Sequence, residues 1–312
     1  MSELPKIGFG TFGSDHYTPE QVAKATAYAL EAGYRLFDCA QVYGNENRIG
    51  EVFADAFRRG LVSREEICIL SKVWNDQHGP GKPTAALKQS LTDLRIDHVD
   101  AYFVHWPFPN DHAPGCDGNT RNPDSVPFSA DAYIRVWSEM ESLHDAGLTL
   151  ELGMSNMTAT KLDAVLPHVR IRPAFIEMEL HPSFQQRELF GYCVAQDIQV
   201  IGFCPLGSPN RPERDRSPRD VSDMELPEVV KVARARNMHP AQVCLLWAAK
   251  LGAIPIPFSG NEKNISANLN CMSDELTDDE MMELKKAERN GRLVKGQVFL
   301  WPGAKGWEDL WD

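Results

Sequence analysis

The sequence predicts an α/β fold: a (β/α)8 barrel of the TIM type, with long loops at its C-terminal mouth, formed by residues 1–312 as a single domain. Segments typical of short apolar strands alternate along the chain with segments typical of helices, which favours parallel strands joined by helical crossovers. Polar side chains follow several of these strands directly. Barrel enzymes place their chemistry at the C-terminal ends of their strands, so these side chains are candidates for a functional site.

Eight strands are expected, and each is separated from the next by enough chain for a helix. They are Ile7–Gly10, Arg35–Asp38, Ile67–Lys72, Ala101–His105, Leu152–Ser155, Phe175–Glu179, Val200–Phe203 and Ala253–Pro257.

Helix signals lie between the strands. Thr18 and Gln21 form a capping box around Pro19, which predicts the start of a helix that a glycine ends. Leucines recur at helical spacing between residues 87 and 94 and predict a second crossover helix. Thr277 opens a late helix by the same capping pattern.

Two long loops and an aromatic C-terminal loop are also predicted. Residues 107–135 follow the fourth strand and residues 205–226 follow the seventh, and long loops inside a compact domain are usually functional or disordered. Both leave the C-terminal side of the barrel, so we expect both to border the mouth. The C-terminal loop, residues 290–312, either packs against the barrel flank or lines a pocket through Trp301, Trp307 and Trp311.

The composition argues against several classes of protein. A formal net charge of −12 disfavours binding to nucleic acid or to anionic membranes. No segment approaches the ~18 consecutive apolar residues of a membrane helix, and the first residues lack a signal-peptide core. The seven cysteines are scattered and include no Cys-x-x-Cys pair. We therefore expect a soluble cytoplasmic protein with reduced thiols, no metal, and a monomeric or weakly oligomeric state.

Asp38, Tyr43, Lys72 and His105 stand at or just beyond the ends of three successive predicted strands. If those strands are parallel neighbours, their side chains converge at the mouth of the barrel. Lys72 beside Tyr43 would favour the phenolate and lower the pKa of the phenol. Asp38 would keep Lys72 charged, and His105 could orient a carbonyl oxygen. Each residue alone has a structural explanation, as a helix cap, a solvated amine or a hydrogen-bonded core histidine, but the set favours catalysis.

These residues and their neighbours resemble the catalytic tetrad of the aldo-keto reductases, and the resemblance extends over nearly the whole chain. The motifs that carry it are Ile7–Gly13, Phe37–Glu46, Ser71–Trp74, Val104–Pro107, Gly153–Asn156, Glu179–Pro182, Pro205–Ser208 and a diverged segment from Ile256 to Asn268. No Gly-x-Gly-x-x-Gly follows a strand, so a Rossmann site is not indicated. The resemblance instead implies a nicotinamide dinucleotide, NAD(P)H, lying across the barrel mouth.

The resemblance also implies cofactor contacts. Ser155 and Asn156 match the pair that binds the nicotinamide carboxamide, and Phe203 matches the aromatic residue that stacks on the ring. Glu177 stands where the family usually has glutamine, and an ionised carboxylate cannot donate to the carboxamide oxygen. The pyrophosphate would meet the backbone around Leu206, Gly207 and Ser208, and the adenosine end would meet Ser259, Asn264 and Asn268.

The adenosine end departs from the family pattern. Phe258 and Asn264 replace the lysine and arginine that usually grip the 2′-phosphate of NADP(H), and Asn210 replaces an aspartate of the covering loop. We therefore expect NAD(H) to serve at least comparably to NADP(H). Four arginines of that loop and Lys263 could contact a phosphate instead, although the mixed charges around the arginines favour a solvated loop; these arginines are Arg211, Arg214, Arg216 and Arg219.

The sequence thus predicts an NAD(P)(H)-dependent oxidoreductase that interconverts an aldehyde or ketone and its alcohol, with Tyr43 as general acid and base. The substrate pocket would be lined by Phe12, Trp74, Trp106, Phe108 and Trp301. One alternative is a cofactor-binding barrel with a regulatory or structural role and little turnover. Another is an unrelated barrel enzyme that uses the arginine-rich loop to bind phosphorylated substrates.

Overall fold

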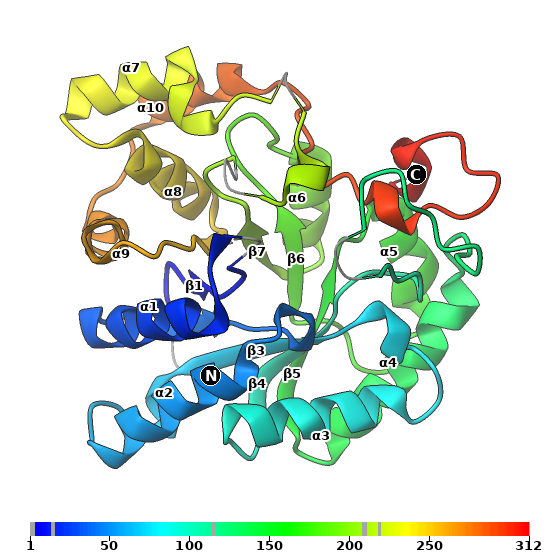
Figure 1. The fold of residues 1–312 in the computed structure, drawn as a ribbon. Helices are drawn as coiled ribbons and strands as arrows, with labels where there is room; N and C mark the ends of the chain where they lie inside the picture. The colour runs from blue at the N-terminus through cyan, green and yellow to red at the C-terminus, as the bar shows by residue number, and fades with distance from the viewer. Residues whose placement is uncertain (1–3, 14–15, 114–115, 208–210, 218–219, 312) are drawn as a thin grey trace.

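The computed structural model describes every residue except 1–3, 14–15, 114–115, 208–210, 218–219 and 312. Within that part of the chain, eight parallel strands form one sheet in chain order, surrounded by helices (Figure 1). The predicted (β/α)8 fold is confirmed, and every predicted strand overlaps an observed one. The strands are β1 (Phe9–Gly10), β2 (Leu36–Asp38), β3 (Cys68–Val73), β4 (Val99–Val104), β5 (Thr149–Ser155), β6 (Phe175–Glu179), β7 (Gln199–Phe203) and β8 (Ile254–Pro255).

The sheet closes because the backbone around β1 also bonds to the backbone around β8. The amide of Gly8 donates to the carbonyl of Pro255 at 3.0 Å, and the amide of Gly10 donates to the carbonyl of Pro257 at 3.0 Å. Closure satisfies the edge groups that an open sheet would expose. It also brings the C-terminal ends of all the strands into one ring.

The interior of the barrel is filled by apolar side chains rather than left open. One cluster comprises Leu36, Leu70, Ala101, Phe103, Phe175, Ile201, Ile254 and Ile256. Gly153 makes room for the ring of Phe103, because a Cβ at that position would lie 2.2 Å from a ring carbon. The packed interior supports the strand ends from below, so the side chains at the mouth stand on a rigid base.

The helices begin and end largely where the sequence signals stand. Thr18 accepts from the amide of Gln21, and Gly33 ends the first helix with φ at 114°. Thr277 caps the last helix with the predicted capping box. The helices are α1 (Pro19–Ala32), α2 (Glu46–Arg58), α3 (Lys82–Leu94), α4 (Ala130–Asp145), α5 (Ala159–Val165), α6 (Arg187–Ala195), α7 (Pro227–Arg236), α8 (Pro240–Leu251), α9 (Glu262–Asn270) and α10 (Asp278–Leu284).

The loop after β4 is shorter than the sequence suggested. Residues 107–135 were expected to be loop, but α4 begins at Ala130 because the hydroxyl of Ser129 accepts from the amide of Ala132 and caps the helix. The remaining loop lies beside the C-terminal segment (Figure 1). Asn110 joins the two by donating to the carbonyl of Phe299 at 2.8 Å.

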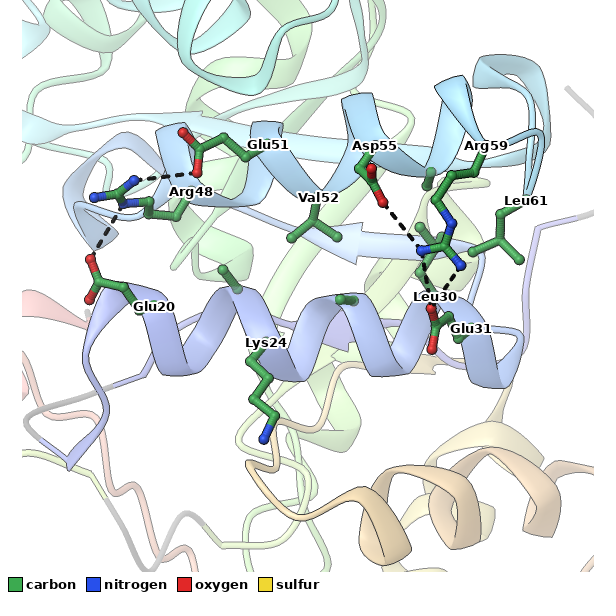
Figure 2. A pocket seen from close by; sticks show the side chains of 13 residues that line it. Glu20, Lys24, Leu30, Glu31, Arg48, Glu51, Val52, Asp55, Arg59 and Leu61 are labelled. Carbon is green, nitrogen blue, oxygen red and sulfur yellow. Dashed lines mark hydrogen bonds and ion pairs between the residues drawn. The ribbon is translucent and has the colours of Figure 1, made fainter.

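An outer groove of about 360 Å³ lies between α1 and α2 (Figure 2). Ion pairs cross it near both ends: Arg48 contacts Glu20 at 3.4 Å, and Arg59 contacts Glu31 at 3.4 Å. None of the residues lining the groove was predicted for the site. The groove therefore does not coincide with the candidate chemistry at the barrel mouth.

No helix among the described residues is long and apolar enough to cross a membrane. Within the same ranges, no group of three or more His, Cys, Asp and Glu side chains is arranged to hold a metal ion.

Candidate active site

The four residues of the predicted tetrad converge at the C-terminal mouth. Asp38 ends β2, Lys72 lies on β3, His105 follows β4, and Tyr43 ends a 3-10 turn beyond β2. The ammonium of Lys72 donates to the carboxylate of Asp38, to the carbonyl of Cys39 at 3.1 Å and to the hydroxyl of Tyr43 at 3.3 Å. The rings of Tyr43 and His105 lie edge to face with their centroids 5.9 Å apart.

Burial sets the protonation of Tyr43. Desolvation raises the pKa of the phenol above its usual value, the ammonium of Lys72 lowers it, and the charges of Asp38 and Glu177 raise it further. Lys72 thus lowers the pKa of the phenol as predicted, but burial outweighs this single cation in the cofactor-free site. Tyr43 therefore keeps its proton at neutral pH, as a proton donor requires.

His105 is held as a neutral imidazole. Burial and the nearby ammonium of Lys72 bring the pKa of His105 well below its usual value. The ring packs edge to face on Trp74 with a centroid separation of 4.9 Å, and its backbone carbonyl accepts from the side chain of Asn156 at 2.9 Å. Its Nδ1 atom is buried and has no hydrogen-bond partner among the described residues. A neutral imidazole carries one N–H donor and one acceptor nitrogen, so it can bind a carbonyl oxygen or a hydroxyl group.

The strand ends beside the tetrad could hold an amide group. Ser155 ends β5, and Asn156 follows with φ at 57°, which turns the chain at this point. The side chain of Asn156 donates to the hydroxyl of Ser155 at 3.2 Å, but its own Oδ1 is buried without a hydrogen-bond partner in the described structure. Oε2 of Glu177 also accepts no hydrogen bond in the described structure, but it lies 3.4 Å from the ammonium of Lys72. Orphaned buried acceptors are costly, so this cradle fits a donor such as a carboxamide NH₂ group.

The loop after β7 contains the residues predicted to meet the pyrophosphate. Phe203 ends β7 half-buried, and Leu206 packs partly buried against the core. Gly207 has φ at 71°, and its amide donates to the carbonyl of Cys204 at 3.0 Å, so this amide already closes a turn. Ser208, like Asn210 and Arg219, lies outside the described residues.

One arginine of that loop is buried rather than solvated. Arg211 is buried, pairs with Asp220 and donates to the carbonyl of Asp215 at 2.9 Å. The interpretation as a solvated charge is therefore wrong for Arg211, because the loop folds around it. Arg216 is exposed and donates to Nε2 of His16 at 2.9 Å, which joins the loop to the segment between β1 and α1.

At the predicted adenosine end, Phe258 is part of an aromatic cluster. Its ring lies 5.0 Å from Tyr17 and 5.7 Å from Phe9, centroid to centroid. Asn264 is exposed on the first turn of α9, and Asn268 is buried on the same helix. Ser259 accepts from the amide of Asn261 at 3.1 Å and so belongs to the turn before α9.

The predicted pocket residues form two layers. Phe12 is 47% exposed and lies over Tyr43 with ring centroids 5.1 Å apart, and Trp74 borders His105. Trp106 and Phe108 are buried below them in a cluster with the C-terminal loop, against which Trp301 packs. The C-terminal loop therefore packs on Trp106 and Phe108 and reaches Trp74 through Phe299, with ring centroids 5.9 Å apart.

Sequence reasoning missed a buried polar cluster next to the site. His181 lies between Glu179 at 2.9 Å and Asp223 at 3.0 Å, and all three are fully buried. Glu179 also accepts from the amides of Leu293 and Val294 at 2.7 and 2.9 Å. The cluster thus joins β6, the loop before α7 and the C-terminal loop. The Glu-Leu-His-Pro segment was visible in the sequence, but nothing local indicated that Asp223 would complete it.

Comparisons with known proteins agree on one family. The family model described as "Aldo/keto reductase family" matches residues 6–289. An aldo/keto reductase of Synechocystis sp. is 35% identical over 311 residues, covering 99% of this chain and 94% of that protein. Aldo-keto reductase family 1 member A1 of Homo sapiens is 35% identical over 294 residues, covering 94% of this chain and 88% of that protein.

A solved structure supports the same relationship. The crystal structure of a Bombyx mori aldo-keto reductase in complex with NADP has a TM-score of 0.81 and 28% sequence identity to this chain. The match covers 93% of this chain and 91% of that one.

Proposed function

Because the chain belongs to the aldo/keto reductase family, it is an oxidoreductase that interconverts carbonyl compounds and alcohols with a nicotinamide cofactor, and we propose that Tyr43 is its proton donor. A bound nicotinamide supplies or accepts the hydride. Tyr43 gives a proton to the carbonyl oxygen during reduction and takes it back during oxidation. Lys72 stabilises the charge that then develops on the phenol, Asp38 keeps Lys72 in place, and His105 orients the oxygen.

The observation that carries this proposal is the contact of 3.3 Å between Lys72 Nζ and the hydroxyl of Tyr43, with Lys72 held by Asp38. The proposal is supported by the neutral phenol of Tyr43 lying against both the buried cation of Lys72 and the neutral imidazole of His105. That arrangement does not support a regulatory or structural role without turnover. The family match also removes the alternative of an unrelated barrel enzyme for phosphorylated substrates.

The test is Tyr43→Phe, with Tyr192→Phe as a matched control whose hydroxyl contacts Asp163 at 2.6 Å away from the tetrad. Losing general acid catalysis should lower kcat/KM for carbonyl reduction by about 10²-fold or more, while cofactor binding stays within a few-fold. The control should keep its activity. If Tyr43→Phe retains more than about a tenth of the wild-type rate, Tyr43 is not the acid.

We further propose that NAD(H) is used at least as well as NADP(H). Phe258, which stands in place of the usual lysine, packs in an aromatic cluster, and Arg211 pairs with Asp220. Neither residue therefore offers a cation to a 2′-phosphate. A charge-assisted hydrogen bond contributes about 1.5–3 kcal/mol, so Asn264→Arg should shift the ratio of dissociation constants toward NADP(H) by about tenfold. The control is Asn270→Arg at the opposite end of α9. A wild-type preference of about a hundredfold for NADP(H) would refute the proposal.

Two finer features complete the proposal. The exposed ring of Phe12 and the partly buried Trp74 favour aldehydes or ketones that present an apolar surface, and Trp106, Phe108 and Trp301 support that wall. The thiols of Cys39, Cys68, Cys193, Cys244 and Cys271 are free, which supports a reducing cytoplasmic location. We propose a monomer or weak oligomer whose partners are its cofactor and small substrates, without nucleic acid or membrane.

A further inference from the structure

Glu177 is a second carboxyl group beside the buried lysine of the site. Its carboxyl group is 2% exposed, and Oε2 lies 3.4 Å from the ammonium of Lys72 without accepting a hydrogen bond among the described residues. Asp38 contacts the same ammonium. Two carboxyl groups therefore share one buried cation.

Two full negative charges in this buried arrangement would cost a large free energy of desolvation. With both carboxyl groups ionised, the buried trio would carry a net charge of −1 away from water, which burial strongly disfavours. Asp38 makes the direct hydrogen bond to Lys72 and so keeps its charge more readily. Burial and the charge of Asp38, opposed by Lys72, raise the pKa of Glu177 to about 8.

Among the described residues, no neighbour of Glu177 other than Lys72 supplies a cation. Along the sheet, Glu177 pairs with Ser155 on β5 and Ile201 on β7, both uncharged. The other titratable groups whose charges act on the trio are Tyr43, His105, Cys39 and Glu46, and the hydroxyls of Ser71 and Ser90 donate to Glu46. The pKa of Tyr43 is raised by burial and that of His105 is lowered by burial, so both are neutral at neutral pH.

We propose that the proton on Glu177 sets the relative affinity of the site for the two forms of the cofactor: protonated Glu177 favours the reduced cofactor, which serves carbonyl reduction, and ionised Glu177 favours the oxidised cofactor, which serves alcohol oxidation. This inference rests on the function proposed above. Reduction consumes one hydride from the cofactor and one proton from Tyr43, and oxidation returns both, so Glu177 is not consumed in either direction.

Two charge effects connect Glu177 to the reaction. Tyr43 becomes negative as it gives up its proton, and a carboxylate beside Lys72 opposes that charge, whereas a neutral acid does not. The nicotinamide ring is positive when oxidised and neutral when reduced. The amide of Asn156 donates to the carbonyl of Glu177 at 3.1 Å, so Glu177 borders the cradle proposed for the carboxamide, and a carboxylate there favours the positive ring.

By linkage, the preference must be reciprocal. Binding of the oxidised dinucleotide should release a proton from Glu177, and binding of the reduced dinucleotide should not. The ratio of the dissociation constants of reduced to oxidised cofactor should therefore rise by about tenfold between roughly pH 6.5 and pH 9.5.

The test uses the full chain, with Glu177→Gln as an uncharged variant of the same shape. The control is Glu46→Gln, which removes a buried carboxyl group bonded to Ser71 and Ser90 at 2.6 and 2.8 Å. Dissociation constants for NAD⁺ and NADH are measured by fluorescence titration across this pH range. Infrared spectra of the cofactor-free protein follow the band of a protonated carboxylic acid.

We expect the ratio of dissociation constants to change with pH in the wild type and in Glu46→Gln, and to stay flat in Glu177→Gln. The infrared band that disappears on raising the pH should be missing from Glu177→Gln alone. Cofactor binding with a ratio that does not change with pH in the wild type would overturn the inference while leaving the proposed function intact. Failure to bind either cofactor would overturn both, and the wild-type measurements decide the matter even if Glu177→Gln does not fold.

Discussion

At the scale of single residues, Glu177 should leave a signature on stability that does not depend on cofactor. The pKa of Glu177 is raised from 4.5 to about 8 by burial. Between these values the folded chain binds more protons than the unfolded chain, so the free energy of unfolding falls as the pH rises. Glu177→Gln removes this fall. Relative to the wild type, the variant should gain up to about 1.4 kcal/mol per pH unit over this window and nothing further above it.

Urea denaturation at several pH values measures that difference, with the exposed Glu262→Gln as a control. A difference between Glu177→Gln and the wild type that is the same at every pH would mean that Glu177 is ionised in the folded protein throughout. The same result would be expected if water reached the carboxyl group.

The positions of the tetrad were predictable because each residue is encoded by its place at a strand end. Asp38 and Lys72 needed only the alternation of strands and helices to be placed on the same rim. The third member of the charged trio, Glu177, was recognised as unusual, but its contact with Lys72 could not be predicted. That contact joins side chains from β3 and β6, which do not pair in the sheet, and so depends on closure of the barrel.

At the scale of elements, the cluster of Glu179, His181 and Asp223 should control the loop before α7. Burial alone would lower the pKa of His181, but hydrogen bonds to Asp223 and Glu179 outweigh it and raise the pKa to about 9. Stability from the protonated imidazole is therefore complete below the ordinary histidine value of about 6.5 and is lost as the pH rises through 9. Asp223→Asn should loosen the loop at neutral pH by weakening this charge network.

Hydrogen exchange measures the effect directly. In Asp223→Asn, amides of residues 220–226 should exchange about tenfold faster at pH 7, and the wild type should approach the same protection above about pH 9. Asp163→Asn, an exposed change at the hydrogen bond to Tyr192, serves as the control. Acceleration spread evenly over the barrel would contradict a local role for the cluster.

Helices and strands were easier to predict than the long connections. Thr18 and Thr277 carry complete capping signals, so both helices begin as predicted. The start of α4 at Ala130 was missed because it depends on one serine cap after a proline-rich stretch. The sequence did not predict the burial of Arg211, because its contact with Asp220 depends on how the loop folds and not on a repeating sequence pattern.

At the scale of the whole molecule, the closed sheet predicts that residues 1–312 unfold as one cooperative domain. Backbone bonds from Gly8 and Gly10 join the last strand to the first, so no group of strands can separate without breaking the ring. Calorimetry should show a single transition, with equal calorimetric and van't Hoff enthalpies. Two resolved transitions in the cofactor-free protein would mean that part of the barrel is an independent unit.

The architecture as a whole followed from the sequence because each crossover is a local unit with its own start and stop signals. The sequence did not predict that the C-terminal loop packs on Trp106 and Phe108, because an aromatic chain end has no periodicity that indicates which residues it contacts. Both interpretations of its tryptophans had therefore to stay open until the fold was known.

The way in which Glu179 holds the C-terminal loop makes that loop a natural module for protein engineering. Its two carboxylate oxygens accept from the backbone amides of Leu293 and Val294, and every residue except proline supplies such an amide. The attachment therefore does not depend on which side chains stand at positions 293 and 294. Loops from related barrels could be grafted after residue 294, or randomised in libraries, to redirect substrate range while the scaffold and its proton-transfer groups stay unchanged.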